Sequence, residues 1–578
     1  MSSSTPLSRA AAGLSLLAVT ALLGCSSPMP EWTPAGGPQM PPARRPTPTA
    51  PAPIPAPAAP AASADAAQPA PYNDLVAARF PEPAVDFRTP AFQPGHAGFT
   101  TNAELQAVLR EIVHGGRNAT LLPLGSSQAG VPLEAVLFTR NPDMSPAAVL
   151  KSGRPTVLLV GQQHGDEPAG SEALIVLARE LAGGGLQDLL DRINVVILPR
   201  ANPDGAQAQR RVTASGIDAN RDHLLLRTPE AQAQARLVRD FQPVLVVDSH
   251  EYTVVGRFLE KFGAVQRFDA LVQYATTANL PEFITKASEE WFRQPMLASL
   301  KQQGLSAEWY YTTSVDVNDK KISMGGTQPD TGRNVNGLKN AVSILIETRG
   351  VGIGRLHLKR RVQTHVVALG SFLRSAADRS ADLVKLRQYV DADVAAKACQ
   401  GDAVVEAGPT PSEYTLQMLD PATGADKALV VNWDSALELQ PLKTRPRACG
   451  YWLAADQGDA VMRLRTLGVR VEQVAAMGVM QGEVYAETAR QTGTRQDVRG
   501  TIADGGAVVH AQVLLTQALM DVPIGSYYVP LSQPLANLVI AALEPDTQNS
   551  FFANGIIGSV TSEARVTAVP GVKLNVLP

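Results

Sequence analysis

The sequence contains few of the features that mark nucleic-acid-binding proteins. It has no extended basic tract, and its 578 residues carry a formal net charge of -3. Proteins that bind nucleic acids usually present a strongly basic surface, so this charge balance argues against a nucleic-acid partner. Histidine is also scarce, with eight residues in the chain, so each histidine in a polar turn is a candidate for chemistry.

Cysteine occurs only three times, at Cys25, Cys399 and Cys449. In an exported protein Cys399 and Cys449 could pair, closing a loop of roughly 50 residues and contributing about 3 to 4 kcal/mol on the chain-entropy model. Two buried free thiols are equally compatible with the sequence, because the sequence gives no distance between them.

The N-terminal apolar run is too short for a comfortable transmembrane helix. It follows a single positive charge, Arg9, and ends in Leu22-Leu23-Gly24, which is typical of a secretory signal. The sequence Leu-Leu-Gly-Cys resembles the lipobox of bacterial lipoproteins, in which Cys25 would be lipidated and begin the mature chain. We therefore expect a signal peptide at 1–24 and a lipid-anchored protein of the bacterial cell envelope, facing the periplasm or the cell surface. An ordinary signal peptide with a chance cysteine is the alternative.

Residues 25–72 are rich in proline and alanine and nearly free of aromatic residues. Such a segment buries too little apolar surface to offset its chain entropy, and its prolines favour extended conformations. We expect a tether that holds a folded body away from the membrane, so that only the N-terminal lipid contacts the bilayer.

About 500 residues follow the tether, more than one hydrophobic core usually holds, so at least two domains are expected. Strand and helix signals alternate in the first, at 73–385. Apolar runs predict strands at 133–138, 157–160, 195–198, 244–247 and 342–346, and helical patterns occur at 102–113, 170–182, 229–241, 287–303 and 355–384. Strands without polar alternation are buried on both faces. The pattern predicts an α/β fold with a mixed, mostly parallel sheet flanked by helices.

Four of these strands end in polar residues, at the edge where such sheets bind ligands. These residues are His164 and Glu167, then Arg200 and the segment Asn202-Pro203-Asp204-Gly205, then Asp248, His250 and Glu251, and finally Glu347. Catalytic zinc takes three nitrogen or oxygen ligands and leaves one position for water. A His-x-x-Glu pair in one turn plus a distant histidine meets that need, so His164, Glu167 and His250 are candidate ligands of one zinc ion per chain.

The ordered set of these motifs resembles the zinc carboxypeptidases of the carboxypeptidase A type. The resemblance rests on His164-Gly-Asp-Glu167, Asn202-Pro-Asp-Gly205, Arg211, Asp218-Ala-Asn220-Arg221, His250 and Glu347, and it covers about half of the chain. It implies a mixed sheet of about eight strands covered by helices, in agreement with the strand pattern.

The resemblance assigns catalytic roles to two residues. Zinc and Glu347 would share the hydrolytic water, the carboxylate taking its proton and passing it to the leaving amine. Arg211 would stabilise the oxyanion, with its neighbour Arg210 as the rival for that role. A structural ion pair between Glu347 and Arg349 is the plainer alternative for the glutamate.

Three further residues would bind substrate, and one would orient a ligand. Asn220 and Arg221 match the pair that grips the terminal carboxylate of the peptide, unless Arg221 simply pairs with Asp222. Arg333 falls where the family sets side-chain preference and would favour an acidic residue, unless it pairs with Asp330. Asp218 would hold His164 by a hydrogen bond.

The sequence departs from the pancreatic enzymes of this family in one respect. Those enzymes carry a mobile tyrosine upstream of the catalytic glutamate, whereas residues 323–340 contain none. Tyr310 and Tyr311 lie too far upstream to be matched.

Residues 400–578 have a different sequence pattern. Apolar and polar residues alternate at 415–419 and 509–515, and turn signals are frequent. We expect a β-rich accessory domain of short strands, with one helix near 458–467 and no ligand-like cluster. Its role cannot be deduced from the sequence.

Three functions fit the sequence. The first is a zinc metallocarboxypeptidase that cleaves the last bond of peptides with a free terminal carboxylate, including cell-wall peptides. The second is a zinc deacylase resembling the aspartoacylase and succinylglutamate desuccinylase branch. The third is a non-catalytic peptide-binding lipoprotein. The Asn-Pro-Asp-Gly and Asp-x-Asn-Arg segments favour the first.

Overall fold

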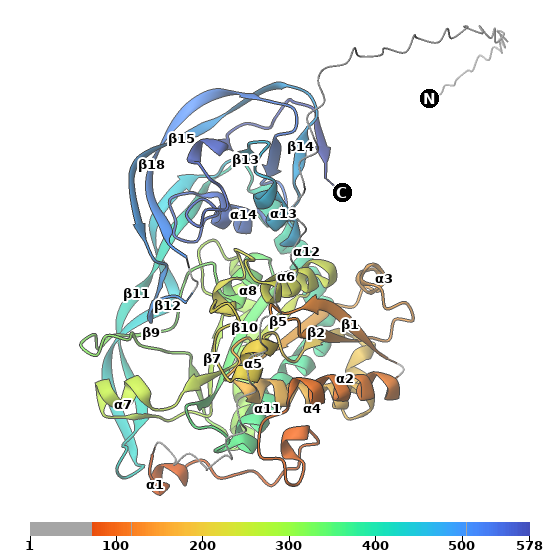
Figure 1. Ribbon diagram of the computed structural model, residues 1–578, viewed down its shortest axis with the longest axis vertical. Helices are drawn as coiled ribbons and strands as arrows, with labels where there is room; N and C mark the ends of the chain where they lie inside the picture. Colours follow the sequence, from red (N-terminus) through yellow and green to blue (C-terminus); the bar gives the residue numbers. More distant parts are fainter. Residues whose placement is uncertain (1–71, 117, 504–505, 578) are drawn as a thin grey trace, which may run out of the picture. The chain divides into compact units, whose positions relative to one another are not determined.

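The largest sheet has eight strands, in the order β1-β2-β4-β3-β5-β10-β7-β8. Figure 1 labels β1, β2, β5, β10 and β7 of this sheet. The computed structural model describes residues 72–116, 118–503 and 506–577. The strands are β1 Ala119–Ser126, β2 Pro132–Phe138, β3 Thr156–Gly161, β4 Asn194–Leu198, β5 Leu245–Thr253, β7 Ala270–Tyr274, β8 Ala307–Trp309 and β10 Val342–Val351. The predicted signal peptide, the lipidation site Cys25 and the tether up to residue 71 lie outside the described residues.

The sheet is mixed, as predicted. β4, β3, β5 and β10 run parallel to one another, and β7 runs parallel to β8. β1, β2 and the pair of β10 with β7 supply the antiparallel contacts. The predicted α/β fold class is therefore confirmed, and the carboxyl ends of β3, β5 and β10 come together at one edge.

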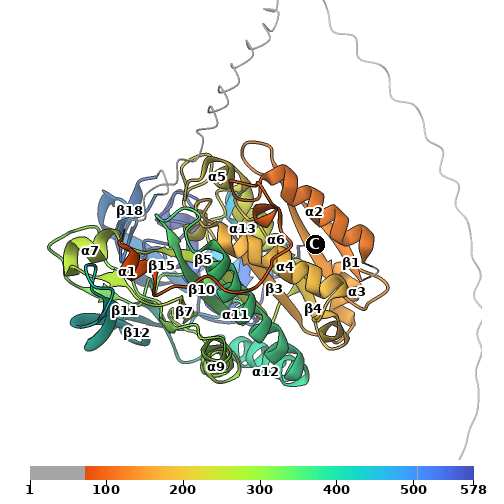
Figure 2. The same ribbon diagram turned by 90° about the horizontal axis from the view of Figure 1, so that it is seen from below.

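Helices cover both faces of this sheet because its strands are apolar on both faces. In β3, Val157 and Leu159 pack with the helices α2 (Asn102–Gly115), α4 (Pro168–Gly183) and α11 (Leu358–Asp378), which lie in front in Figure 2. Leu158 and Val160 point the other way and pack with α3 (Pro146–Lys151) and α6 (Pro229–Phe241). This alternation is the two-residue period of a strand.

Two of the predicted helices are broken. The predicted helix 355–384 is two helices, α11 and α12 (Ser380–Ala396), separated at Arg379, whose φ of -107° and ψ of 21° are not helical. The predicted helix 287–303 begins with a π-helical turn at Ser288–Arg293 and continues as α9, Gln294–Gln302. Pro295 explains the wide turn, because it has no N–H to donate to the preceding turn.

Several further helices in the first region are short. They are α1 Asp74–Ala77, α5 Pro203–Ala208, α7 Gly256–Phe262, α8 Glu282–Ala287 and α10 Gly332–Leu338. 3-10 turns occur at Pro90–Phe92, Gln187–Asp191, Ala219–Arg221 and Val560–Ser562. Within the described part of the chain, no helix has the length and apolar character needed to cross a bilayer.

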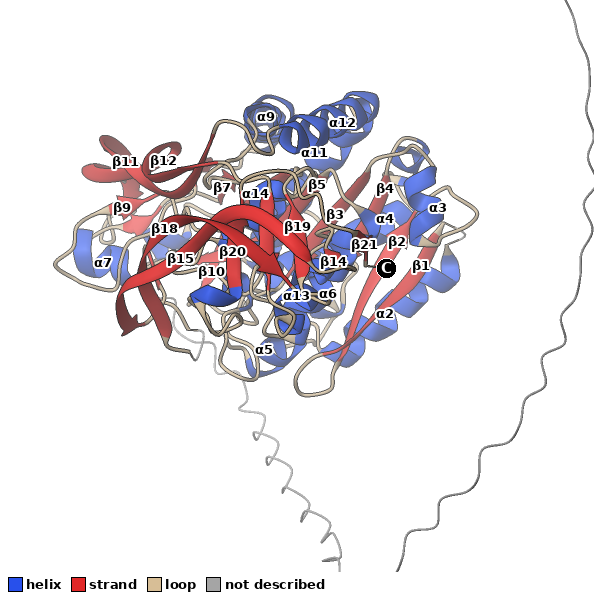
Figure 3. Cartoon of the chain, turned by 90° about the horizontal axis from the view of Figure 1, so that it is seen from above, coloured by secondary structure: helices blue, strands red, loops and turns tan. Residues whose placement is uncertain are grey.

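The C-terminal region is β-rich, but the expectation of short strands alone was wrong. Two long antiparallel ribbons dominate it, β11 (Asp402–Leu419) with β12 (Asp426–Pro446) and β15 (Gly478–Gly493) with β18 (Val508–Val522). Figure 3 shows the β15–β18 ribbon sweeping across the molecule. The short strands are β13 Gly450–Leu453, β14 Glu472–Val474, β19 Tyr527–Pro530, β20 Glu563–Val566 and β21 Leu574–Val576, which join β15 and β18 in one seven-stranded sheet.

One helix in this region was not predicted from the sequence. The expected helix near 458–467 is α13, Gly458–Thr466, but the apolar run inside 523–545 also forms a helix, α14, Ala536–Leu543. Because this helix is buried on nearly all sides, its sequence is almost entirely apolar and shows no amphipathic pattern with a helical period.

The C-terminal region is joined to the first region by sheet pairing. β11 pairs with β6 (Val265–Gln266), and β12 pairs with β9 (Ile322–Ser323). Tyr451, Val529 and Leu538 belong to the same hydrophobic core as the eight-stranded sheet. The division at 385–400 stays a prediction, since these two regions share a core. Cys399 and Cys449 form a disulfide across a separation of 50 residues, which decides between the two alternatives for these thiols.

Candidate active site

The loop after β3 carries His164 and Glu167, and its shape is fixed by local contacts. Glu167 is the N-cap of α4, with Pro168 at the first helical position, where a proline costs nothing because its missing N–H would have no partner. Gly165 approaches the backbone of Gly205 so closely that a Cβ would lie 1.9 Å from the Gly205 carbonyl carbon. Asn202 caps α5 by accepting from Gly205 N at 2.9 Å and donates to Gln163 O at 3.1 Å. The Asn-Pro-Asp-Gly segment therefore braces the loop.

His250 reaches the same edge from β5, and Glu347 from β10. The two are register partners in the parallel β5–β10 pair, so their side chains leave the sheet on the same face. Asp248 lies two residues before His250 on β5 and faces the same way for the same reason.

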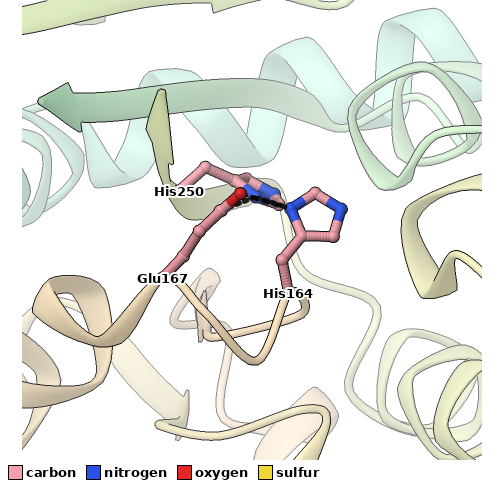
Figure 4. Close-up of side chains that lie close together, drawn as sticks. All are labelled: His164, Glu167 and His250. Atoms are coloured by element: carbon pink, nitrogen blue, oxygen red, sulfur yellow. Dashed lines mark hydrogen bonds and ion pairs between the residues drawn. The ribbon is translucent and has the colours of Figure 1, made fainter. Parts of the chain in front are cut away.

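His164, Glu167 and His250 converge on one point (Figure 4). His164 Nδ1 lies 2.7 Å from Glu167 Oε1, His250 Nδ1 lies 2.8 Å from Glu167 Oε2, and the two Nδ1 atoms are 3.1 Å apart. All three residues are buried, and their ligand atoms lie within 4.8 Å of one another. Two imidazole nitrogens and one carboxylate oxygen are the donor set of catalytic zinc, so the residues fit that ion.

The outward-facing imidazole nitrogens are held by carboxylates. His164 Nε2 lies 3.1 Å from Asp218 Oδ1, where the sequence analysis placed Asp218, and His250 Nε2 lies 2.8 Å from Asp248 Oδ2. Burial opposes ionisation of Asp218, but Arg211 and His164 hold the pKa of that carboxyl well below its ordinary value. Such contacts leave Nδ1 free to bind a metal. The sequence analysis placed Asp248 at this edge of the sheet but gave it no role, although its spacing from His250 on one strand was a usable signal.

A cavity of about 490 Å³ opens in front of the three candidate ligands. Glu347 lies on its wall, and burial together with the nearby Glu167 carboxylate raises the pKa of Glu347 to about 7. Arg349, the alternative partner of this glutamate, donates instead to Gln266 O at 2.9 Å. A carboxyl group with a pKa near neutrality can both take and return a proton under physiological conditions.

Arg211 points at the candidate ligands, whereas Arg210 is exposed. Arg211 Nη1 lies 3.2 Å from His164 Nδ1 and 3.5 Å from Glu167 Oε1, and its Nε donates to Asp218 Oδ2 at 3.0 Å. Of the two arginines, Arg211 is therefore the one beside the candidate ligands, and its catalytic role stays a prediction.

Asn220 and Arg221 are both engaged with protein groups. Asn220 Oδ1 accepts from Gly332 N at 2.8 Å, and its Nδ2 lies 3.1 Å from His250 Nε2. Arg221 pairs with Asp497 at 2.6 Å and reaches Asp330 at 3.9 Å, so the suggested pair with Asp222 does not form. Their assignment to the terminal carboxylate stays a prediction.

Arg333 and Tyr310 line the same cavity. Arg333 donates to Gly326 O at 3.0 Å, and Asp330 pairs with Arg495 at 3.1 Å rather than with Arg333. Burial lowers the pKa of Arg333 to about 10. Tyr310, which the sequence analysis set aside, packs its ring against Gly325, where a Cβ would meet it at 2.8 Å. A phenol is therefore present in the cavity although residues 323–340 lack one.

The C-terminal region also contributes to the cavity, through Val498 and Arg499. They lie in the turn between the two-residue strands β16 (Gln496–Asp497) and β17 (Gly500–Thr501). No local sequence signal marked this hairpin as part of the site.

Comparison with known proteins agrees with this geometry. A family model described as zinc carboxypeptidase matches residues 106–351. Carboxypeptidase 2 of Trichophyton rubrum is 30% identical over 409 residues, which cover 69% of this chain and 74% of that protein. The chain belongs to the zinc carboxypeptidase family. This carboxypeptidase is thus a metal-dependent peptide hydrolase with zinc as its cofactor, and its cluster of His164, Glu167 and His250 is consistent with that ion.

Solved structures similar to this carboxypeptidase include two bacterial proteins. The metallo-carboxypeptidase of Burkholderia cenocepacia is 16% identical, with 48% of this chain and 69% of that chain covered and a TM-score of 0.36. The metallo-carboxypeptidase of Pseudomonas aeruginosa, in complex with (2-guanidinoethylmercapto)succinic acid, is 19% identical, with 48% and 68% covered and a TM-score of 0.36.

Proposed function

We propose that this zinc carboxypeptidase removes the C-terminal residue of peptides with His164, Glu167 and His250 as metal ligands and Glu347 as general base. The observation that carries the proposal is the convergence of the three ligand residues beside one cavity, on whose wall Glu347 lies. The deacylase and the binding-protein alternatives receive no comparable support, because the similar proteins named above are carboxypeptidases.

In the proposed hydrolysis, the metal and the side chains of the protein have separate roles. Zinc, when bound, supplies Lewis-acid polarisation and acidifies water. Glu347 then accepts the proton of the attacking water and returns it to the leaving amine, a cycle that suits its pKa of about 7. Arg211 donates to the oxygen that becomes negatively charged as the carbonyl is attacked.

Arg333 supports a preference for an acidic C-terminal side chain. Among the described residues no carboxylate pairs with it, and it lies buried in the cavity wall. A buried charge without a counter-ion is costly, and a substrate carboxylate would relieve that cost. Substrates ending in Glu should therefore be turned over faster than substrates ending in Lys or Phe.

The N-terminal sequence supports a location at the bacterial cell envelope, through a lipid on Cys25 and the Pro- and Ala-rich tether. A carboxypeptidase held there would meet cell-wall peptides, so murein fragments belong among the candidate substrates. Replacement of Cys25 by Ser should move the protein from the membrane fraction to the soluble fraction, and an unchanged distribution would contradict the anchor.

The full chain tests the enzymatic proposal directly. Metal analysis should give one zinc per chain, and N-benzoyl-Gly peptides ending in Glu, Lys or Phe should be cleaved at the last bond. Murein fragments and N-acetyl-aspartate complete the screen. Cleavage of the acyl amino acid without cleavage of any peptide would overturn the proposal in favour of a deacylase.

A further inference from the structure

We propose that Arg499, carried by the C-terminal hairpin at 495–501, binds the terminal carboxylate of the substrate. The inference rests on the proposed carboxypeptidase function and adds a substrate contact from outside the eight-stranded sheet. It would make the C-terminal region a part of the substrate site.

The hairpin is fixed to the catalytic region by several contacts around the cavity. Arg495 is buried and donates to Arg221 O at 3.0 Å and to Asp330 at 3.1 Å. The backbone of Asp218 donates to Ala503 O at 2.7 Å, and Val315 N donates to Arg499 O at 3.1 Å. The hairpin is therefore held on both sides of Arg499, which leaves only its side chain to adjust.

The positive charge of Arg221 is already paired with a protein carboxylate, that of Asp497. Its Nη2 lies 2.6 Å from Asp497 Oδ2, its Nε also reaches that oxygen at 3.1 Å, and its Nη1 donates to Asn220 O at 2.7 Å. Its side chain is only 10% exposed, and that of Asp497 is 8% exposed. A substrate carboxylate would have to displace a buried carboxylate already in place, which is unfavourable because Asp497 would lose its counter-ion.

Arg499, in contrast to Arg221, has no carboxylate partner among the described residues. It lies on the cavity wall with Glu347 and Arg211, and in the described ranges its guanidinium has no hydrogen bond and no ion pair. Repulsion from Arg211, together with burial, lowers the pKa of the Arg499 guanidinium. A partly desolvated cation beside other cations favours the binding of an anion, and a guanidinium binds a carboxylate through two parallel hydrogen bonds.

Its position suits the last residue of a peptide. The terminal carboxylate lies one residue beyond the bond that is cut, so the cation that binds it must lie near the catalytic groups. Arg499 lines the same cavity as Glu347 and Tyr310. Arg333 also has no ion pair among the described residues, but it donates to Gly326 O; it is the rival candidate for this contact.

The test compares two probes that differ only at the terminus, N-benzoyl-Gly-Phe and the same peptide with a C-terminal amide. Binding of both is measured by calorimetry with the zinc-loaded full chain carrying Glu347→Gln, which should not hydrolyse the acid, and turnover of the acid by the chain with Glu347 intact gives KM and kcat. In Arg499→Gln the Kd and KM of the acid should rise roughly 10- to 100-fold, the loss expected for a charge-assisted pair, with little change for the amide. Arg499→Lys should recover part of the loss, because it restores the charge without the fork.

Arg257→Gln is the matched control, since Arg257 lines the same cavity and donates to Thr313 O. It should leave the acid-to-amide ratio, which is the Kd of the free acid divided by the Kd of the amide, within twofold of wild type. Zinc content and the unfolding temperature of each variant establish that the site and fold are intact.

Three results would overturn the proposal. The first is an unchanged acid-to-amide ratio in Arg499→Gln. The second is a loss of the preference for the acid in Arg333→Gln instead. The third is a KM that falls in Asp497→Asn while Arg499→Gln has no effect, which would return the role to Arg221. A wild-type protein that binds zinc but cleaves no peptide contradicts the proposed function, whereas the binding ratio still tests Arg499 separately.

Discussion

Glu347 and His250 lie side by side because they are register partners on the adjacent parallel strands β10 and β5. Neighbouring strands are about 4.8 Å apart, and partners in a parallel pair point to the same face. The proposed base and a proposed zinc ligand therefore share one side of the sheet. A slip of either strand by one residue would turn one of them away from the cavity.

Replacement of Glu347 by Gln should abolish turnover and leave the metal in place. Glutamine keeps the size of the side chain but cannot accept a proton, and general acid–base catalysis contributes roughly 10²- to 10⁴-fold to rate. We expect kcat for the best peptide to fall by that factor, with one zinc retained per chain in metal analysis.

Glu260→Gln is the control for that experiment, because Glu260 lines the same cavity but is exposed. It should keep most of the wild-type kcat. Residual activity of more than a few per cent in Glu347→Gln would remove this residue from the role of general base.

Asp248→Asn should weaken zinc binding. Asp248 Oδ2 lies 2.8 Å from His250 Nε2 and also accepts from Gln163 Nε2 at 2.6 Å, so the ring orientation of His250 depends on this carboxylate. Loss of such a partner typically lowers metal affinity about 10- to 100-fold. Competition with a chelator of known affinity measures the change, and Asp240→Asn on the surface should have no effect. Equal affinities in the two variants would show that the contact does not support the metal.

Gly165→Ala should disrupt the ligand loop. The added Cβ would lie 1.9 Å from the carbonyl carbon of Gly205 and 2.2 Å from its oxygen, and backbone cannot yield as a flexible side chain can. Overpacking of this kind costs about 1 to 3 kcal/mol and would shift His164. We expect a lower unfolding temperature and a lower zinc content.

Gly183→Ala, at the end of the helix that follows this loop, is a matched control because nothing lies within 4 Å of its Cβ position. It should behave as wild type in both measurements. A Gly165→Ala protein with full zinc content would mean that the loop can relax without moving its histidine.

The candidate zinc ligands could be predicted because they depend on local sequence. Each lies at or just beyond the end of an apolar strand, and parallel strand ends meet at one edge. His164, Glu167 and His250 therefore come together from three short motifs. Asp248 could have been added by the same reasoning, since its side chain must face the same way as that of His250.

The contributions of distant segments could not be predicted in this way. Arg499 and Asp497 lie in a short hairpin without any unusual local sequence. Arg499 reaches the cavity, and Asp497 reaches Arg221, only because the long C-terminal ribbons return to the catalytic region. The sequence also gives no signal for the helix break at Arg379, because neither a proline nor a glycine lies there. Both features are set by tertiary packing, which overrides local propensity.

Lys339 should make the stability of the folded protein depend on pH. It is 5% exposed, and burial, with repulsion from Arg239 and Arg387, lowers its pKa to about 7. Its unfolded pKa is near 10.5, so between these values the unfolded chain binds more protons than the folded one. The free energy of unfolding therefore rises with pH across this window, and the folded state carries the full penalty of the buried charge below pH 7.

Lys339→Met removes that penalty with little change in volume. We expect the variant to be more stable than wild type by about 1 to 3 kcal/mol at pH 6, with the difference shrinking as the pH approaches 10. Thermal unfolding at a series of pH values measures both curves, and the exposed Lys301→Met controls for the general effect of removing a charge. Parallel curves for Lys339→Met and wild type would mean that Lys339 is solvated in the folded state, because only a shifted pKa makes the two diverge.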